Sequence, residues 1–138
     1  MTRLIQLSEA ANLALHALAY LGFQDRNRLV SSSSIANTLG ASEAHLSKVL
    51  RMAARYGLVR STRGAKGGFS LIRDPEQVTL LEIVEMIDGP IVKESCLMPS
   101  QICVENKCIL GNLFDSLHKL ARQHLSQAHL SDFRFKSL

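Results

Sequence analysis

The sequence is poor in aromatic residues: tryptophan is absent, and phenylalanine and tyrosine make up only 5% of its 138 residues. Proteins that bind single-stranded nucleic acid stack bases on aromatic side chains, so this mode of binding is not expected. No apolar run approaches the ~20 residues of a membrane span, and residues 1–6 lack the pattern of a signal peptide. We therefore expect a cytoplasmic protein with one domain-sized hydrophobic core.

Catalytic motifs are also missing from the sequence. It has no Walker phosphate-binding loop, no nucleophile placed beside a base and no paired carboxylates in a plausible site. Its five histidines are scattered along the chain, at positions 16, 45, 118, 124 and 129. These absences predict a protein that is not an enzyme.

Acidic residues are missing from one long segment. Residues 48–73 contain seven basic residues and no aspartate or glutamate, which leaves nine basic and twelve acidic residues elsewhere, a net charge of −3. Such segregation indicates a surface that faces phosphates, although a basic solvated face is the alternative. The seven residues are Lys48, Arg51, Arg55, Arg60, Arg63, Lys66 and Arg73.

A helix-turn-helix is predicted at the start of this region. One of the serines at 31–34 caps a short helix over about 33–39, and Gly40 closes it. Ser42 caps a second helix that ends at Gly57, and a tight glycine turn between two helices is typical of this motif. The second helix is expected to enter the major groove of double-stranded DNA. Its predicted DNA-binding residues are Ser42, His45, Ser47, Lys48 and Arg51.

A β-hairpin is predicted next. Residues 58–62 and 69–72 alternate like strands, with a glycine-rich turn between them, and Leu29–Val30 forms a short strand or a packing link. The tip carries Arg63 and Lys66, which suit a narrow minor groove. The glycines could instead cradle a nucleotide phosphate, but no helix follows them.

Three further helices complete the prediction. The first covers about 7–23 with Ser8 as its cap, and the second runs from a Thr79–Glu82 capping box to Ile87. The third runs from Cys108 or Ile109 to about Ala128 and is roughly 30 Å long. The tail beyond Leu130 is expected to be poorly ordered.

The last predicted helix lacks a partner within the chain. Its apolar residues follow the alternating three- and four-residue spacing of a coiled-coil seam. A homodimer is the simplest way to bury such a seam, and it suits a palindromic operator. The seam residues are Leu110, Leu113, Leu117, Leu120 and His124.

The predicted fold class is mainly α with a small β-hairpin wing: a winged helix-turn-helix plus a long C-terminal dimerisation helix. We divide the chain into a DNA-binding domain at 1–90, a cysteine-bearing loop at 91–108, and the dimerisation helix with its tail at 109–138.

The odd number of cysteines argues against a closed disulfide framework. Cys96, Cys103 and Cys108 are separated by six and then four residues. Three thiolates in one loop suit a zinc or iron–sulfur site, and zinc is the weaker fit because zinc knuckles have tighter pairs. The alternatives are small apolar residues or redox thiols. The competing function is therefore a metal-free winged-helix regulator with a thiol redox switch.

Several motifs together resemble a known family, the iron–sulfur regulators typified by the repressors IscR and NsrR. The resemblance covers roughly residues 3–128. It implies a dimeric winged-helix repressor or dual regulator controlled by the state of a cluster on the three cysteines. It places base contacts at Ser42, Ser47 and Lys48 and the minor-groove arginine at Arg63. The motifs are Arg3–Leu4, Gly57–Val59, Arg63–Phe69, Glu82–Ile83 and the cysteine loop.

The sequence departs from this family at the cluster loop. The common spacing has five residues in each gap, and the histidine that follows the last cysteine in one relative is Gly111 here. In other relatives an acid of the first helix reaches the partner's cluster, and Glu9 aligns with it. His118 and His124 are alternative fourth ligands. A [4Fe–4S] cluster is slightly favoured over [2Fe–2S], and the signal is nitric oxide, redox state, or iron or cluster supply.

Overall fold

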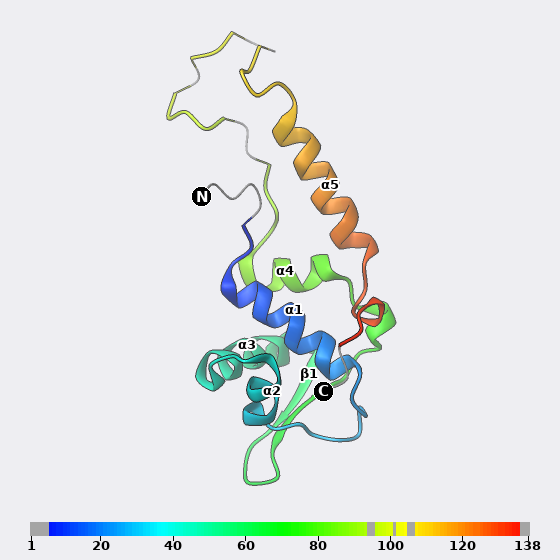
Figure 1. Cartoon of the computed structure of the whole chain (residues 1–138). Helices are drawn as coiled ribbons and strands as arrows, with labels where there is room; N and C mark the ends of the chain where they lie inside the picture. Colours follow the sequence, from blue (N-terminus) through cyan, green and yellow to red (C-terminus); the bar gives the residue numbers. More distant parts are fainter. Residues whose placement is uncertain (1–5, 94–95, 101, 105–106, 136–138) are drawn as a thin grey trace.

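The computed structural model describes residues 6–93, 96–100, 102–104 and 107–135. Figure 1 shows the hairpin and the last helix projecting from opposite ends of the molecule. None of the helices in these ranges is long and apolar enough to cross a membrane. The elements are α1 (Glu9–Gly22), α2 (Ser32–Leu39), α3 (Glu43–Arg55), β1 (Val59–Thr62), β2 (Gly68–Leu71), η1 (Pro75–Gln77), α4 (Leu80–Asp88), α5 (Leu113–Gln127) and η2 (Leu130–Asp132).

The predicted helix-turn-helix is present, with the predicted caps. The side chain of Ser31 accepts a hydrogen bond from the Ser34 amide, and that of Ser42 accepts one from the His45 amide. Gly40 has a left-handed φ of 64°, which ends α2 and turns the chain into α3. The motif therefore forms from local signals that the sequence contains.

The hairpin pairs β1 and β2 antiparallel, with Val59 opposite Leu71 and Thr62 opposite Gly68. Val30 adds an isolated bridge to Phe69, with N–O distances of 2.8 and 2.9 Å. The predicted link at 29–30 is thus a one-residue strand beside β2. It joins the hairpin to the start of α2.

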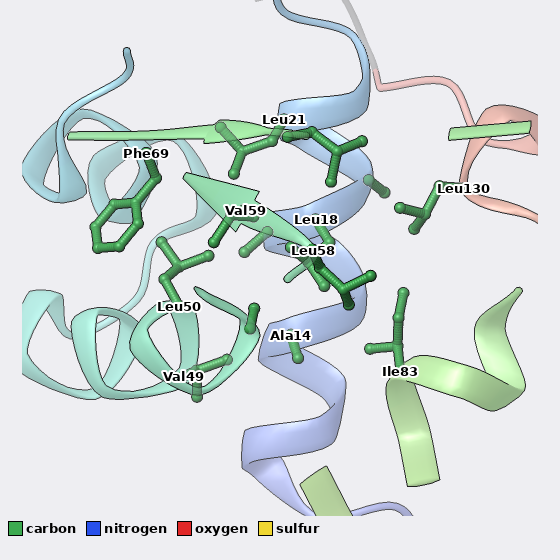
Figure 2. Close-up of a cluster of buried hydrophobic side chains, with 14 of the residues drawn as sticks. Ala14, Leu18, Leu21, Val49, Leu50, Leu58, Val59, Phe69, Ile83 and Leu130 are labelled. Carbon is green, nitrogen blue, oxygen red and sulfur yellow. The ribbon is translucent and has the colours of Figure 1, made fainter. Parts of the chain in front are cut away.

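The core surrounds α1. Leu18 and Leu21 of α1 are buried against side chains from α3 and the hairpin, including Leu50 and Val59 (Figure 2). Ile83 of α4 closes the other side of the same cluster. This packing fixes the hairpin and α3 relative to each other, because both rest on one central helix.

The first and fourth helices follow the prediction with small differences. Ser8 caps α1, so Leu7 lies outside the helix, which ends at Gly22 rather than Phe23. Thr79 caps α4 by accepting from the Glu82 amide at 3.2 Å. The Glu82 carboxylate pairs with Arg73 instead of completing the predicted capping box.

The prediction for the start of the last helix was wrong by four or five residues, since it placed the start at Cys108 or Ile109. Gly111 takes a left-handed φ of 58°, and its amide bonds to the Cys108 carbonyl in a turn. The helix begins only after this turn, at Leu113, so Leu110 lies outside it. The apolar spacing continues through the turn, which explains why the pattern suggested a longer helix.

The expectation of a poorly ordered tail beyond Leu130 was also wrong, as far as Phe135. Leu130 is fully buried, and its amide bonds to the Val78 carbonyl at 3.0 Å. Phe135 packs edge-on against Tyr20 and Phe23. Tertiary burial, rather than any local propensity, holds this segment against α1.

Candidate nucleic-acid interface and cysteine segment

A polar groove of about 460 Å³ lies between the starts of α2 and α3 and the hairpin. We call it the recognition groove. It brings together three of the predicted DNA-binding residues, Ser47, Arg51 and Arg63. Its other lining residues are Ser31, Ser32, Ser33, Glu43, Ser61, Thr62, Gly64, Ala65, Gly67, Gly68 and Phe69.

The remaining predicted DNA-binding residues lie beside this groove. Ser42 and Lys48 are exposed on α3, and His45 is half-buried in its first turn. The Ser42 oxygen already accepts from the His45 amide, so its hydroxyl proton and one remaining lone pair are left for a ligand. Lys66 is exposed at the hairpin tip and lines a different cavity.

Sequence reasoning missed the contribution of α2 to this groove. The serines at 31–34 were predicted only as caps, and Glu43 was not among the predicted DNA-binding residues. The structure places Ser32 and Glu43 on the groove wall, where the Ser32 hydroxyl donates to the Glu43 carboxylate at 2.9 Å. The helix-turn-helix pattern itself was the available signal, because it brings the two helix starts together.

The charge pattern of residues 48–73 is largely a surface feature. Six of the seven basic residues are exposed, whereas Arg73 is half-buried and pairs with Glu82. Arg73 therefore belongs to the internal packing between the hairpin and α4. The other six cations remain available to an anionic partner.

The hairpin glycines allow the hairpin backbone to pack directly against neighbouring backbone atoms. A Cβ at Gly67 would lie 2.2 Å from the Thr62 carbonyl oxygen, and one at Gly68 would lie 2.4 Å from the Val30 oxygen. Both distances are too short for any side chain. This backbone crowding explains the glycines without a bound nucleotide phosphate.

The cysteine segment lies between α4 and α5. Cys96 is half-buried, Cys103 and Cys108 are exposed, and all three are free thiols. Among the residues that the structure describes, no three metal-binding side chains are close enough to hold one ion. The structure thus does not bring the cysteines together with Glu9, which is exposed in the first turn of α1. The donor set of three accessible thiols still suits an iron–sulfur cluster.

An ion pair and a hydrogen bond attach the start of this segment to the helices on either side. Lys93 lies 2.8 Å from Asp115 of α5, and Lys119 contacts the other oxygen of the same carboxylate at 2.8 Å. Hydrogen bonds from Lys119 and Lys93 lower the pKa of Asp115 from 3.8 to about 2. On the α4 side, the Glu85 carboxylate accepts from the Ile91 amide.

The start of α1 is attached to the end of α4. The Asp88 carboxylate accepts hydrogen bonds from both the amide and the hydroxyl of Ser8. Next to this contact is an apolar cavity of about 610 Å³ between α4, α5 and the residues that precede α1. Leu117, Leu120 and His124 of the predicted seam line it.

No residue of α5 is fully buried among those described. Leu113 is 39% exposed and Leu120 is 64% exposed. His118 is half-buried, and its Nδ1 atom has no hydrogen-bond partner among the residues that the structure describes. Neither it nor His124 lies within a group of metal-binding side chains in the described residues.

Comparison with known proteins shows one consistent family. The model of the family described as "Rrf2: Iron-dependent Transcriptional regulator" matches residues 7–134. A putative HTH-type transcriptional regulator of Aquifex aeolicus is 34% identical over 113 residues, 80% of this chain and 78% of the relative. The HTH-type transcriptional regulator NsrR of Shouchella clausii is 28% identical over 107 residues, 78% of this chain and 69% of the relative.

Solved structures show the same fold. CymR, the global cysteine regulator of B. subtilis, superposes with a TM-score of 0.77 at 25% identity, over 94% of this chain and 95% of that one. IscR of T. potens has a TM-score of 0.71 at 23% identity, over 93% and 85%. These matches confirm the family inferred from the sequence motifs, the winged-helix fold and the prediction that the protein is not an enzyme. The chain belongs to the Rrf2 family of DNA-binding transcriptional regulators.

Proposed function

We propose that the protein is a dimeric repressor whose affinity for a double-stranded DNA operator is controlled by an iron–sulfur cluster on Cys96, Cys103 and Cys108. The observation that carries this proposal is the pairing of two features in one Rrf2 chain. One is the cation-lined recognition groove, and the other is a segment of three free thiols attached to both α4 and α5.

The DNA half of the proposal assigns α3 to the major groove. Side chains of its N-cap and first three turns face base edges, and the hairpin tip enters the adjacent minor groove. Arg63 is the minor-groove contact, since it is exposed and lines the recognition groove. The α3 contacts are Ser42, His45, Ser47, Lys48 and Arg51, and Lys66 is the second cation of the tip.

The cofactor half assigns the three thiolates as cluster ligands, with Glu9 of the partner subunit as the fourth. Glu9 is exposed, and the Ser8–Asp88 hydrogen bonds hold its helix start in place. A [4Fe–4S] cluster fits three sulfurs and one oxygen better than [2Fe–2S]. Such a cluster supplies sensitivity to nitric oxide, redox state or iron and cluster supply.

Coupling between cysteines and DNA is proposed to run through α5. The Lys93–Asp115 pair joins the cysteine segment to the start of this helix. At its other end, the Ala128 carbonyl accepts from the Leu80 amide, and Leu130 bonds to Val78, which follows the hairpin in sequence. Ordering of the cysteine segment would therefore change the position of α5 and, through these contacts, of the reading head.

The exposure of apolar side chains on α5 supports a homodimer. Its apolar side chains are only partly covered, and a second copy of the helix would bury them. Two reading heads then match a palindromic operator. Because that operator is chromosomal DNA, we place the protein in the cytoplasm.

A metal-free thiol switch is the second candidate. The exposed free thiols favour it, as does the structural likeness to a protein named as a global cysteine regulator. Anaerobic purification separates the two candidates, because a cluster gives visible absorbance and bound iron. Substituting Cys103→Ser should remove both signals. Iron-free, colourless wild-type protein after anaerobic purification would favour the thiol switch.

The DNA half is tested with Arg63→Ala. Loss of a base or minor-groove arginine should weaken specific binding by about 1–3 kcal/mol. Arg55→Ala is the matched control, because Arg55 is exposed in the last turn of α3 and does not line the recognition groove. Equal affinities of the two variants across DNA sequences would contradict the placement of the hairpin.

A further inference from the structure

A second cavity lies on the other side of the hairpin tip from the recognition groove. It measures about 480 Å³ and sits between the hairpin, the start of α2 and the chain that joins α1 to α2. We call it the flanking groove. Its lining residues are Tyr20, Gln24, Arg28, Leu29, Val30, Ser31, Ser34, Ala65, Lys66 and Gly67. None of them is acidic.

The two cations of the tip are divided between the two grooves. The Gly67 amide bonds to the Gly64 carbonyl at 2.9 Å, which closes a tight turn over Ala65 and Lys66. Arg63, before the turn, lines the recognition groove but not the flanking groove, and Lys66, within the turn, lines the flanking groove but not the recognition groove. Ala65 lines both, so the tip is the partition between them.

Arg28 supplies a second cation to the flanking groove. A turn positions it: the Asp25 carbonyl accepts from the Arg28 amide at 3.0 Å, and the Asp25 carboxylate accepts from the Asn27 amide at 2.9 Å. The Arg28 side chain is exposed, and no ion pair found among the described residues involves it. It therefore faces the groove as an uncompensated charge.

A hairpin tip inserted in a minor groove has a phosphate backbone on each side. The minor groove of B-DNA is only about 6 Å wide, so both backbones must run close to the inserted residues. The recognition groove lies on the α3 side of the tip. It can therefore receive the backbone that runs between the major groove occupied by α3 and the minor groove occupied by the tip. The flanking groove lies where the second backbone would run.

We propose that the flanking groove binds the phosphate backbone of this second strand, with Arg28 and Lys66 as its cationic contacts. The proposal rests on the minor-groove placement of the hairpin and extends it. The tip then acts as a wedge between two backbones, and its two cations neutralise one strand each. The Arg28 contact lies in the chain between α1 and α2, outside the helix-turn-helix and hairpin.

A neighbouring cavity provides the matched control. Arg26 lies in the same turn as Arg28 and is equally exposed, but it lines a separate cavity. Four carboxylates line that cavity, so it should repel phosphate. They belong to Asp25, Asp74, Glu76 and Asp132.

The test uses the sequence that wild-type protein selects from a random duplex library. Duplexes carrying one uncharged methylphosphonate linkage at successive positions map which phosphates matter on each strand. Wild-type binding should weaken for linkages on both sides of the minor groove that the tip occupies. Arg28→Ala should lose this sensitivity on one strand only and should lower the salt dependence of binding by about one unit of log–log slope per protomer.

The outcomes separate this proposal from the placement of the hairpin. Arg26→Ala should retain the wild-type map and slope, and Arg28→Gln should repeat the Arg28→Ala result with a longer side chain. The proposal is overturned if Arg28→Ala keeps the sensitivity on both strands, or if both arginine variants change the slope equally. Should Arg63→Ala leave binding unchanged, the hairpin placement itself fails, whatever Arg28 does.

Discussion

Glu43 is the single carboxylate among the described residues that line the recognition groove. It stands in the first turn of α3 and accepts from Ser32. A carboxylate in this position can accept a hydrogen bond from the amino group of cytosine in the major groove. It also repels phosphates, so it selects against backbone positions that bring a phosphate near it.

We expect Glu43→Ala to relax selection at one base pair of each half-site by about 1–3 kcal/mol. Total affinity for unrelated duplexes should rise at the same time, because a negative charge leaves the groove. Selection from a random library, read by sequencing, measures both effects. Ser32→Ala is the control: it removes the partner hydroxyl and keeps the charge, and base selection unchanged in both variants would refute this role.

The ion pairs of Asp115 should make the stability of the fold depend on pH. Its folded pKa is lowered from 3.8 to about 2 by Lys119 and Lys93. A depressed carboxyl pKa stabilises the fold above the unfolded value, so this contribution should be lost as the pH falls from 3.8 toward 2. The stability difference between wild type and Asp115→Asn should shrink over that window. A difference that is constant with pH would contradict the two ion pairs.

Local contacts were predictable from single residues, and distant ones were not. Ser31, Gly40 and Ser42 act as predicted, because a cap bonds to an amide within three residues and needs no tertiary context. The Ser8–Asp88 contact joins residues 80 positions apart. No pattern within either segment indicates its partner.

At the scale of elements, η2 is a structural anchor for the end of α5. Leu130 within it is fully buried, and the Thr79–His129 bridge pairs the residue just before it with the cap of α4. We expect Leu130→Ala to lower the free energy of unfolding by ~2–5 kcal/mol through the lost contacts and the cavity left behind.

Urea unfolding followed by circular dichroism measures this loss. Ile72→Ala is the control, since Ile72 is 54% exposed, lies outside α5 and should change the stability by less than ~0.5 kcal/mol. Equal effects of the two substitutions would mean that the chain beyond α5 contributes nothing to the core.

Helices were predictable where the sequence has both a periodic pattern of apolar residues and a residue that caps the helix end. Helix α3 has the Ser42 cap and a four-residue buried stripe; its start agrees with the prediction, and it ends at Arg55, two residues before the predicted Gly57. The last helix has the periodic apolar pattern but no N-terminal capping bond, since the Asn112 side chain makes none. Its start was therefore misplaced, and the ordering of 130–135 depends on burial that a local pattern does not contain.

At the scale of the whole molecule, the account requires a dimer built on α5. Introducing a charge into its partly exposed apolar face, as in Leu120→Asp, should raise the dimer dissociation constant by at least ~10-fold, about 1.4 kcal/mol. Light scattering coupled to gel filtration measures the mass at several concentrations. Gln123→Asp places the same charge at an exposed polar position of α5 and should leave the dimer intact. A monomeric wild type at all concentrations would remove the dimer from the account.

The molecule separates its two proposed activities in space. Hairpin residues line the recognition groove, and the described parts of the segment between α4 and α5 lie at the opposite end of the molecule from the hairpin (Figure 1). The sequence predicted both regions from charge and cysteine spacing. It did not predict the contribution of α2 to the groove or the ion pairs of Lys93 and Asp115, because these depend on how the elements pack.

The central claim is that cysteine chemistry controls operator affinity. The most direct measurement follows one anaerobically purified sample through iron content, visible absorbance and operator binding, before and after the cluster is removed by chelation. The account predicts bound iron, visible absorbance, and a change of at least ~10-fold in operator affinity, about 1.4 kcal/mol, when both are lost. An affinity that stays the same while iron and absorbance disappear would contradict it.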